Sequence, residues 1–358
     1  MKILGIETSC DETSAAVVTD DKKILANCVL SQMEHQEFGG VVPEIAARAH
    51  LKYIENIIRQ AMDDSQTSFE EIDGIAATCG PGLIGGVMVG MMTAKALAAV
   101  HNKPFLAINH LEGHALTPRL TDDIAFPYLL LLVSGGHSQI LIVQDVGKYK
   151  RLGTTIDDAL GEAFDKTAKL MGLGYPGGPA LEKLALNCPD LEHALKQFPL
   201  PTPMKGKDNC LFSFSGLKTA VRRYIDAFPE GPIPRDQAAN LCAAFQHSVA
   251  LVVEDRLKRA INLYTTQYPN LPRPTLVVSG GVAANKYLRQ KLEHICHQTH
   301  LYFSAPPIGL CSDNGAMIAW AGVERFKKGL TDPLDYKARP RWPLDPDAPP
   351  AIGAGVKA

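Results

Sequence analysis

The chain has 358 residues, of which 46% are hydrophobic and 21% are charged, and its formal net charge is −2. This length predicts about two domains with ample apolar core, and the near-zero net charge excludes a chain-wide positive field that would attract nucleic acid. The eight cysteines form no C-x-x-C pair, acidic Glu7 interrupts the N-terminal apolar segment, and the longest apolar run ends at Lys95. These features favour a cytoplasmic protein with reduced thiols, without a secretory signal or a membrane span.

The first predicted element is a β-hairpin. Two apolar runs, at residues 3–6 and 15–19, are predicted as buried strands. The turn between them is rich in hydroxyls and carboxylates and includes Asp11 and Glu12. A third strand is expected at residues 24–30, and a helix begins at Pro43, with Glu44 in its first turn.

A strand at residues 72–78 and a helix at 83–100 flank the sequence Gly-Pro-Gly-Leu-Ile-Gly at 80–85. This is formally G-x-G-x-x-G, the fingerprint of a dinucleotide site. That site also needs an acidic residue about 20 positions later, but the next acid is Glu112, and Pro81 fills the crowded turn. A tight turn into a closely packed helix is therefore favoured.

Small residues recur every fourth position in that helix, beside three methionines. They are Gly82, Gly86 and Gly90 with Met88, Met91 and Met92. Such a stripe allows another helix to approach closely. Packing inside the chain is the first expectation, and docking of a partner helix is the second, in which case Gly86→Leu should disrupt a heterodimer.

Two histidines, His110 and His114, stand four residues apart and project from one face of a predicted helix. On spacing alone a surface pair is the commoner explanation, but the pair also suits one divalent metal. Asp313, in a polar interruption before the last predicted helix, is the best candidate for a third ligand. A zincin would place glutamate directly after the first histidine, whereas Leu111 stands there, so peptide hydrolysis is disfavoured.

A second hairpin follows, with apolar strands at 127–133 and 139–143 and the turn Ser-Gly-Gly-His-Ser at 134–138. It repeats the first hairpin about 125 residues later, and this indicates a duplicated domain. Glycines and hydroxyls at such a tip offer N–H and Oγ groups to a phosphate.

Further along, a helix is expected at residues 157–171, carrying Asp165. A strand with Ser-Gly-Gly at its end, at residues 275–285, provides another turn suited to a nucleotide. Residues 336–342 form the one basic stretch with interleaved aromatic residues, which indicates contact with nucleic acid.

Seven short motifs together identify a resemblance. They are Ile-Glu-Thr-Ser-Cys-Asp-Glu-Thr at 6–13, Gly-Pro-Gly at 80–82, His-Leu-Glu-Gly-His at 110–114, Val-Ser-Gly-Gly-His at 133–137, Gly-Glu-Ala-Phe-Asp-Lys at 161–166, Ser-Gly-Gly-Val-Ala-Ala-Asn at 279–285 and Ser-Asp-Asn at 312–314. In this order they resemble the bacterial branch of the tRNA threonylcarbamoyladenosine transferase family, formerly described as glycoproteases, from residue 2 to about 343.

The resemblance implies an α/β fold of the actin/Hsp70/sugar-kinase type, with two similar lobes and a ligand cleft between them. The expected lobes are residues 1–125 and 126–343, with a last helix at about 314–328 that could pack back on the first lobe. Residues 344–358 are expected to be a flexible tail.

The resemblance also implies site residues. His110, His114 and Asp313 are the implied ligands of one divalent metal per subunit, Fe²⁺ or Zn²⁺. The implied phosphate-side loop of a bound adenylate consists of Leu132, Val133, Ser134, Gly135 and Gly136. The implied contacts to its ribose and base come from Asp165, Gly178 and Asn285.

The implied reaction is transfer of a threonylcarbamoyl group from threonylcarbamoyl-AMP to N6 of adenosine 37 in tRNAs that read ANN codons, with Asp11 or Glu12 as the proton acceptor. The implied partners are tRNA, a smaller relative of the same fold (TsaB-like) that docks through the helices at 43 and 83, and an ATPase (TsaE-like). A metallopeptidase and an ATP-binding chaperone-like or kinase-like module remain alternatives, but the latter has no use for two histidines with Asp313.

Overall fold

The computed structural model describes residues 1–38 and 40–349, and their contacts form two compact units. The first unit comprises Met1–Phe126, Gln144–Tyr149 and Pro306–Pro346. The second comprises Pro127–Val143 and Lys150–Ala305, together with residues 347–349. The expected boundary between the lobes was at 125/126. The contacts also place residues 144–149 and the last helix in the first unit, and the sequence had allowed for that helix. Of the expected tail, residues 350–358 lie outside the described residues, and Leu344 is buried.

The first unit is built on a five-stranded sheet with the strand order β3-β2-β1-β4-β5. Its strands are β1 (Lys2–Glu7), β2 (Glu12–Thr19), β3 (Ile24–Ser31), β4 (Gly74–Gly80) and β5 (Phe105–Asn109). β1 and β2 form the predicted antiparallel hairpin, and β4 and β5 run parallel to β1. The carboxyl ends of β1, β4 and β5 therefore share one edge, which is where open α/β sheets bind ligands.

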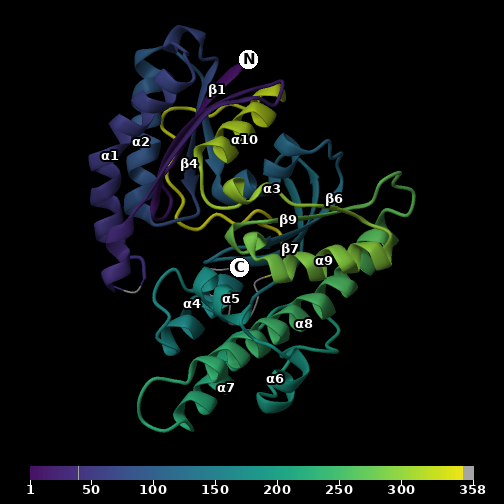
Figure 1. Cartoon of the computed structure of the whole chain (residues 1–358). Helices are drawn as coiled ribbons and strands as arrows, with labels where there is room; N and C mark the ends of the chain where they lie inside the picture. The colour runs from purple at the N-terminus through teal and green to yellow at the C-terminus, as the bar shows by residue number, and fades with distance from the viewer. Residues whose placement is uncertain (39, 350–358) are drawn as a thin grey trace. The chain divides into compact units, whose positions relative to one another are not determined.

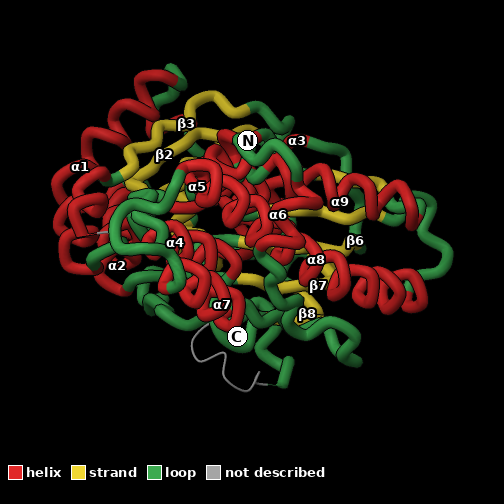
Figure 2. The backbone as a smooth tube through the Cα atoms, turned by 60° about the horizontal axis from the view of Figure 1, so that its bottom comes forward, coloured by secondary structure: helices red, strands yellow, loops and turns green. Residues whose placement is uncertain are grey.

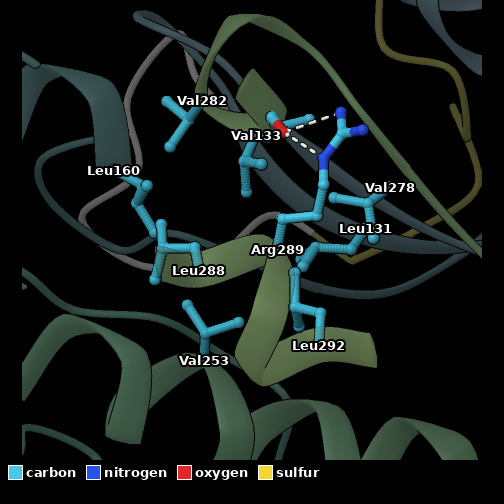
Figure 3. Close-up of a pocket in the computed structure, with 10 residues that line it drawn as sticks. Leu131, Val133, Leu160, Val253, Val278, Val282, Leu288, Arg289 and Leu292 are labelled. Carbon is cyan, nitrogen blue, oxygen red and sulfur yellow. Dashed lines mark hydrogen bonds between the residues drawn. The ribbon is translucent and has the colours of Figure 1, made fainter. Parts of the chain in front are cut away.

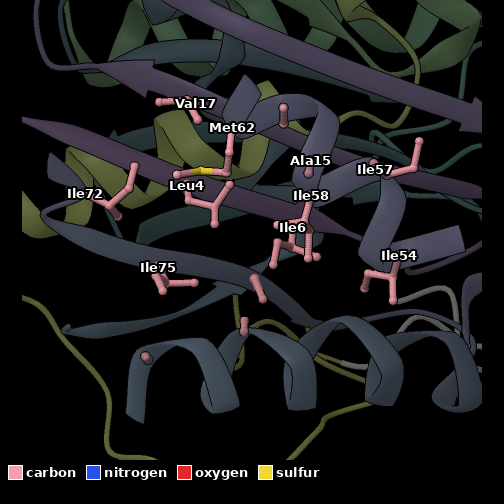
Figure 4. Close-up of a cluster of buried hydrophobic side chains, with 14 of the residues drawn as sticks. Leu4, Ile6, Ala15, Val17, Ile54, Ile57, Ile58, Met62, Ile72 and Ile75 are labelled. Carbon is pink, nitrogen blue, oxygen red and sulfur yellow. The ribbon is translucent and has the colours of Figure 1, made fainter. Parts of the chain in front are cut away.

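Helices cover both faces of this sheet because its strands alternate apolar residues between the two faces. They are α1 (Pro43–Asp64), α2 (Ile84–Val100), α3 (His110–Thr121) and α10 (Gly315–Lys327). Leu4 and Ile6 face α1, which also lies over β2 and β3, as Figure 2 shows. Figure 4 shows the resulting core, with Ile54 and Ile58 of α1 against these strands. Ile3 faces the other way, toward α10 and α3.

The second unit repeats this arrangement with the strand order β10-β9-β6-β7-β8. Its strands are β6 (Tyr128–Val133), β7 (Ser138–Asp145), β8 (Lys148–Thr154), β9 (Thr275–Ser279) and β10 (Tyr302–Ser304). β6 and β7 form the second predicted hairpin, and β9 runs parallel to β6 and to β10. The duplication predicted from the two hairpins is confirmed by these matching strand orders.

The second unit also carries most of the helices that follow the hairpin. They are α4 (Leu160–Leu170), α5 (Gly177–Ala185), α6 (Leu191–Gln197), α7 (Ser215–Asp226), α8 (Arg235–Gln267) and α9 (Lys286–Thr299). α8 runs beside α5, α6 and α9 (Figure 1). The helix expected at 157–171 begins only at Leu160, because the Asp157 carboxylate instead accepts hydrogen bonds from the N–H groups of Phe214 (2.8 Å) and Ser215 (3.3 Å) at the start of α7.

The glycine stripe of α2 packs inside the first unit. Thr8, in the turn after β1, donates from Oγ1 to the carbonyl of Gly86 (2.8 Å) and accepts from the N–H of Gly90 (3.1 Å). A Cβ atom on Gly86 would lie 2.5 Å from the Thr8 carbonyl oxygen. The expectation that this stripe receives a partner helix is therefore wrong, since the first hairpin already occupies it.

All eight cysteines are free thiols. Within the described ranges, every helix is too short or too polar to cross a membrane.

We expect Gly86→Leu to destabilise the protein by about 1–3 kcal/mol or more, because the backbone of Thr8 cannot move away without breaking its bonds to α2. Thermal denaturation measures this loss. Gly216→Leu is the matched control, since a Cβ on Gly216 meets nothing within 4 Å. Equal melting temperatures for the two variants would contradict the packing described.

Candidate active site and its metal ligands

The two histidines lie at the start of α3, at the carboxyl edge of the first sheet. Asn109 ends β5 and caps the helix, because its Oδ1 accepts from the N–H of Leu111 (2.9 Å). His110 is 7% exposed and His114 is 0% exposed, so this is not a surface pair. Their ring centroids are 4.8 Å apart.

Asp313 reaches the histidines from the segment before α10. Asn314 caps this helix, since its Oδ1 accepts from the N–H of Met317 (3.1 Å), and the N–H of Gly315 donates to Ser14 Oγ (2.7 Å) on β2. These bonds fix the start of α10 against the first hairpin. Asp313 Oδ1 consequently lies 3.0 Å from His114 Nε2 and 3.6 Å from His110 Nε2.

This donor set fits a divalent metal. The ligand atoms of His110, His114 and Asp313 lie within 4.8 Å of one another. Ligands about 2.1 Å from a tetrahedral metal are themselves roughly 3.4 Å apart, close to the two distances to Asp313. Among the residues whose side chains the structure describes, this is the one such cluster of His, Cys, Asp and Glu.

Glu7 contacts the second ring nitrogen of His110, Nδ1. Its Oε2 accepts from His110 Nδ1 (3.0 Å) and from Thr78 Oγ1 (2.5 Å), and Ser9 Oγ also lies 3.1 Å from His110 Nδ1. A carboxylate on Nδ1 directs Nε2 toward the metal position, as in many metal sites. Sequence reasoning missed Glu7 because it ends an apolar strand, although a carboxylate at that position was a signal.

The charges of this cluster perturb one another. Burial lowers the pKa of His110, but the charges of Asp313 and Glu7 outweigh burial and raise this pKa to about 9. Burial raises the pKa of Glu7, but the charge and hydrogen bond of His110 outweigh it and hold the pKa below its usual range. A metal that binds His110 must displace a proton from it, so we infer that metal affinity increases with pH up to about 9.

Glu112, the acid of the histidine motif, has a different role from the general base of a zincin. It is 2% exposed, and its Oε1 accepts from the N–H of Gly147 and from Tyr149 Oη, both at 2.9 Å. Its Oε2 lies 3.3 Å from Arg325 of α10. Glu112 thus joins α3 to α10 and to the β7–β8 turn. Its carboxylate binds together the helix that carries the two histidines and the helix that follows Asp313.

The predicted proton acceptors lie at the tip of the first hairpin. Asp11 precedes β2, and its carbonyl accepts from the N–H of Gln32 (3.0 Å). Glu12 is the first residue of β2. Burial and then the charge of Asp313 raise the pKa of Glu12 well above its usual range.

The predicted phosphate loop follows β6 in the second unit. Leu132 and Val133 are buried in the strand, and Ser134 closes the turn by donating its N–H to the carbonyl of His137 (2.8 Å). A Cβ on Gly135 or Gly136 would meet nothing within 4 Å, so the protein leaves space beside this backbone.

Two other segments meet this loop. The N–H of Gly161, in α4, donates to the carbonyl of Ser134 (3.1 Å), and a Cβ on Gly161 would lie 2.7 Å from that oxygen. Gly280 has φ +94° after β9, and a Cβ there would lie 2.4 Å from the carbonyl of Val133. The three glycine-rich motifs of this unit therefore converge on one edge of its sheet.

The predicted nucleoside contacts are joined by α5. Asp165 Oδ1 accepts from the N–H groups of Gly177 (2.9 Å) and Gly178 (3.2 Å) at the start of this helix. Glu182, later in α5, accepts from the N–H of Lys286 (2.7 Å), which follows Asn285. The structure thus brings these residues together around α5, although Asp165 and Asn285 also serve as backbone caps.

An apolar cavity lies beneath the loop that follows β9, which contributes Val282 to its lining (Figure 3). It is lined by side chains of β6, β9, α8 and α9, and its volume of about 10 Å³ admits at most one water. Arg289 crosses it and donates from Nε (3.2 Å) and Nη2 (3.1 Å) to the carbonyl of Ala283. The cavity is too small for a nucleotide, and Arg289 braces the loop above it.

We expect His110→Ala and Asp313→Ala to lose bound metal, because each removes a ligand that no neighbour replaces in the described cluster. Glu7→Gln should weaken metal affinity by roughly 10- to 100-fold through the loss of its charge behind His110. Elemental analysis and metal titration of the purified protein measure both effects. His294→Ala, at an exposed histidine, is the control, and unchanged metal content in both ligand variants would refute this assignment.

The sequence of this chain matches those of known proteins along most of its length. The family model described as TsaD, tRNA N6-adenosine threonylcarbamoyltransferase, matches residues 23–320. Proteins of that name from Brucella suis and Brucella canis are each 55% identical to this chain, over 99% of it and 98% of their own length.

Solved structures share the fold at low sequence identity. HypF of T. kodakarensis aligns with a TM-score of 0.61 and 12% identity, over 91% of this chain and 48% of its own. The activator of 2-hydroxyisocaproyl-CoA dehydratase from Clostridium difficile aligns with a TM-score of 0.50 and 14% identity, over 93% and 99%. The predicted actin/Hsp70/sugar-kinase type of α/β fold is thereby confirmed. On the family match and the identity across nearly its whole length, the chain belongs to the tRNA N6-adenosine threonylcarbamoyltransferase family.

Proposed function

We propose that this chain transfers a threonylcarbamoyl group from threonylcarbamoyl-AMP to N6 of adenosine 37 in tRNAs that read ANN codons, in the cytoplasm. The observation that carries the proposal is the 55% identity, over 99% of the chain, to transferases of this name. The buried cluster of His110, His114 and Asp313 adds chemical support, because a chaperone-like or kinase-like module of the same fold has no use for it.

We assign His110, His114 and Asp313 as the residues that would hold one Fe²⁺ or Zn²⁺ ion. Such an ion, when bound, supplies a Lewis acid for the threonylcarbamoyl carbonyl. Three protein ligands leave a coordination position for substrate. Glu7 keeps the His110 ring oriented, and Glu112 keeps α3 and α10 in register, so these two carboxylates position the ligands.

The second unit is assigned the adenylate. Gly135 and Gly136 are exposed, and a Cβ on either would meet nothing within 4 Å, so their N–H groups would hold the AMP phosphate as it departs. Asp165, Gly178 and Asn285 would hold the ribose and base, with Arg289 as a brace for the adjoining loop.

The proton released by the N6 amine needs an acceptor. Asp11 and Glu12 at the hairpin tip are assigned this task.

The proposal predicts the nucleoside composition of tRNA. In bacterial cells depleted of their own enzyme, this chain should restore threonylcarbamoyladenosine, measured by mass spectrometry of tRNA nucleosides. Gly135→Val should fail, because its side chain takes the space needed by the phosphate while meeting nothing in the protein. Gly216→Val, equally free of contacts, should restore the nucleoside. A folded wild-type chain that restores none would overturn the proposed function.

We further propose that a smaller relative of the same fold docks on α1 and α2, and that an ATPase joins the complex. The face of α2 opposite its glycine stripe is exposed and apolar: Ile84, Met88 and Met92 recur every fourth residue and are 45%, 49% and 53% exposed. Leu51 of α1 is 68% exposed, and α1 packs on α2. An apolar surface of this kind is typical of a protein interface.

The variant Met88→Asp/Met92→Asp should abolish co-elution with that partner in size-exclusion chromatography, because it places two charges on an apolar contact surface. Its melting temperature should stay near that of the wild type, since both side chains are half exposed. Leu263→Asp, at a residue 46% exposed on α8, is the control. Retained co-elution of the double variant would exclude this surface.

A further inference from the structure

A segment of the first unit without regular secondary structure, residues 332–342, runs from the start of β5 to the carboxyl edge of the sheet. It begins at Asp332, whose N–H donates to the carbonyl of Phe105 (2.9 Å) and whose Oδ2 accepts from the N–H of Ala107 (2.9 Å). Lys95 of α2 donates to the carbonyl of Tyr336. We call this segment the strap.

The strap then reaches the metal ligands. The N–H of Arg339 donates to the carbonyl of Cys79 (2.7 Å), at the end of β4, and the carbonyl of Pro340 accepts from the N–H of Gly82 (3.3 Å). The carbonyl of Trp342 accepts from Nδ2 of Asn109 (2.9 Å), the residue that caps the helix of His110 and His114. The backbone of residues 339–342 is therefore fixed at the edge where the first unit carries its candidate site.

The side chains of the strap divide by polarity. Tyr336 and Trp342 pack against the core, with their ring centroids 5.8 Å apart. Lys337, Arg339 and Arg341 are exposed, and none of them forms an ion pair with any residue that the structure describes. The guanidinium of Arg339 lies 4.9 Å from the Tyr336 ring centroid and 5.0 Å from that of Trp342, which holds its charge in place.

Three exposed cations on a fixed backbone, without acidic partners, favour a polyanion as the ligand. The chain as a whole has a net charge of −2 and so supplies no general attraction. Lysine and arginine contacts to phosphates position nucleic acids without reading their sequence. Loops of RNA whose bases are unpaired are the common targets of cations interleaved with aromatic residues.

We propose that the strap binds the phosphates of the tRNA loop on either side of the adenosine that enters the site, through Lys337, Arg339 and Arg341. This proposal rests on the proposed function, because it takes tRNA as the substrate. An adenosine brought to the metal ligands carries its neighbouring phosphates past residues 337–341, since Asn109 joins the strap to the histidine helix. An acidic surface of a partner protein is the competing ligand, and it is a separate outcome of the test below.

The test uses Lys337→Gln/Arg339→Gln/Arg341→Gln in the full-length protein. Transfer is assayed in an extract of cells depleted of their own enzyme, which supplies any partner proteins. We expect kcat/KM for tRNA to fall about tenfold or more at low salt, and the slope of its logarithm against the logarithm of salt concentration to flatten by about 2, because three phosphate contacts are lost. Metal content and the KM for the nucleotide should not change.

Matched variants separate charge from folding. Lys22→Gln/Lys23→Gln/Lys103→Gln removes three cations at the opposite edge of the same sheet, at the β2–β3 turn and before β5, and should leave both the rate and the salt slope unchanged. Lys337→Gln/Arg341→Gln keeps the stacked Arg339 and should show about two thirds of the change in slope.

The outcomes are distinct. If the wild-type chain forms no threonylcarbamoyladenosine, the proposed function itself fails. If the wild type is active and the strap variant keeps its tRNA kinetics and salt slope, only the strap proposal fails. If the variant instead loses a partner protein from the complex while its affinity for tRNA is unchanged, the strap is a protein-binding surface and the proposal is overturned.

Discussion

The buried contact between Glu7 and His110 is the interaction on which the rest of the first unit depends. Glu7 is fully buried at the end of β1, and its carboxylate joins β1 to β4 through Thr78 and to α3 through His110. Removing one partner from a buried charged pair typically costs about 3–5 kcal/mol, because the other charge stays in the interior without compensation. The same carboxylate therefore links the candidate ligand His110 to the contact between β1 and β4.

The two units use one arrangement of strands for different chemistry. In each, a hairpin and two parallel strands place the polar ends of several segments on one edge of the sheet. The first unit fills its edge with imidazoles and carboxylates, which suit a cation. The second fills it with glycines. Gly161 and Gly280 pack against the carbonyls of Ser134 and Val133, whereas Gly135 and Gly136 leave space beside their backbone, which suits an anion. A duplicated fold can thus present edges of different chemistry in its two units.

The sequence predicted these features where the signal was local. Apolar runs located both hairpins. The spacing of His110 and His114, with Asp313 as the polar interruption before a helix, located the three residues that the structure brings together as candidate metal ligands. Glu7 and Glu112 were missed as positioning groups, because their partners lie 103 and 37 residues away in Glu7–His110 and Glu112–Tyr149. The strand β8 was missed because its sequence, Lys-Tyr-Lys-Arg-Leu-Gly-Thr, is largely polar. The glycine stripe was correctly seen as a close contact, but a stripe does not show which neighbour it receives.

The two faces of α2 show why the choice of neighbour matters. Its glycine face holds Thr8 at the root of the first hairpin turn, while Ile84, Met88 and Met92 lie on its exposed face. A ligand that binds only the folded form of a segment stabilises that form by mass action. A protein bound to the methionine face would therefore stabilise α2 and, through Thr8, the turn that carries Ser9, Asp11 and Glu12. One face of α2 is the exposed apolar surface, and the other contacts the turn that precedes β2. Substitutions on either face therefore have to be interpreted with the other in mind.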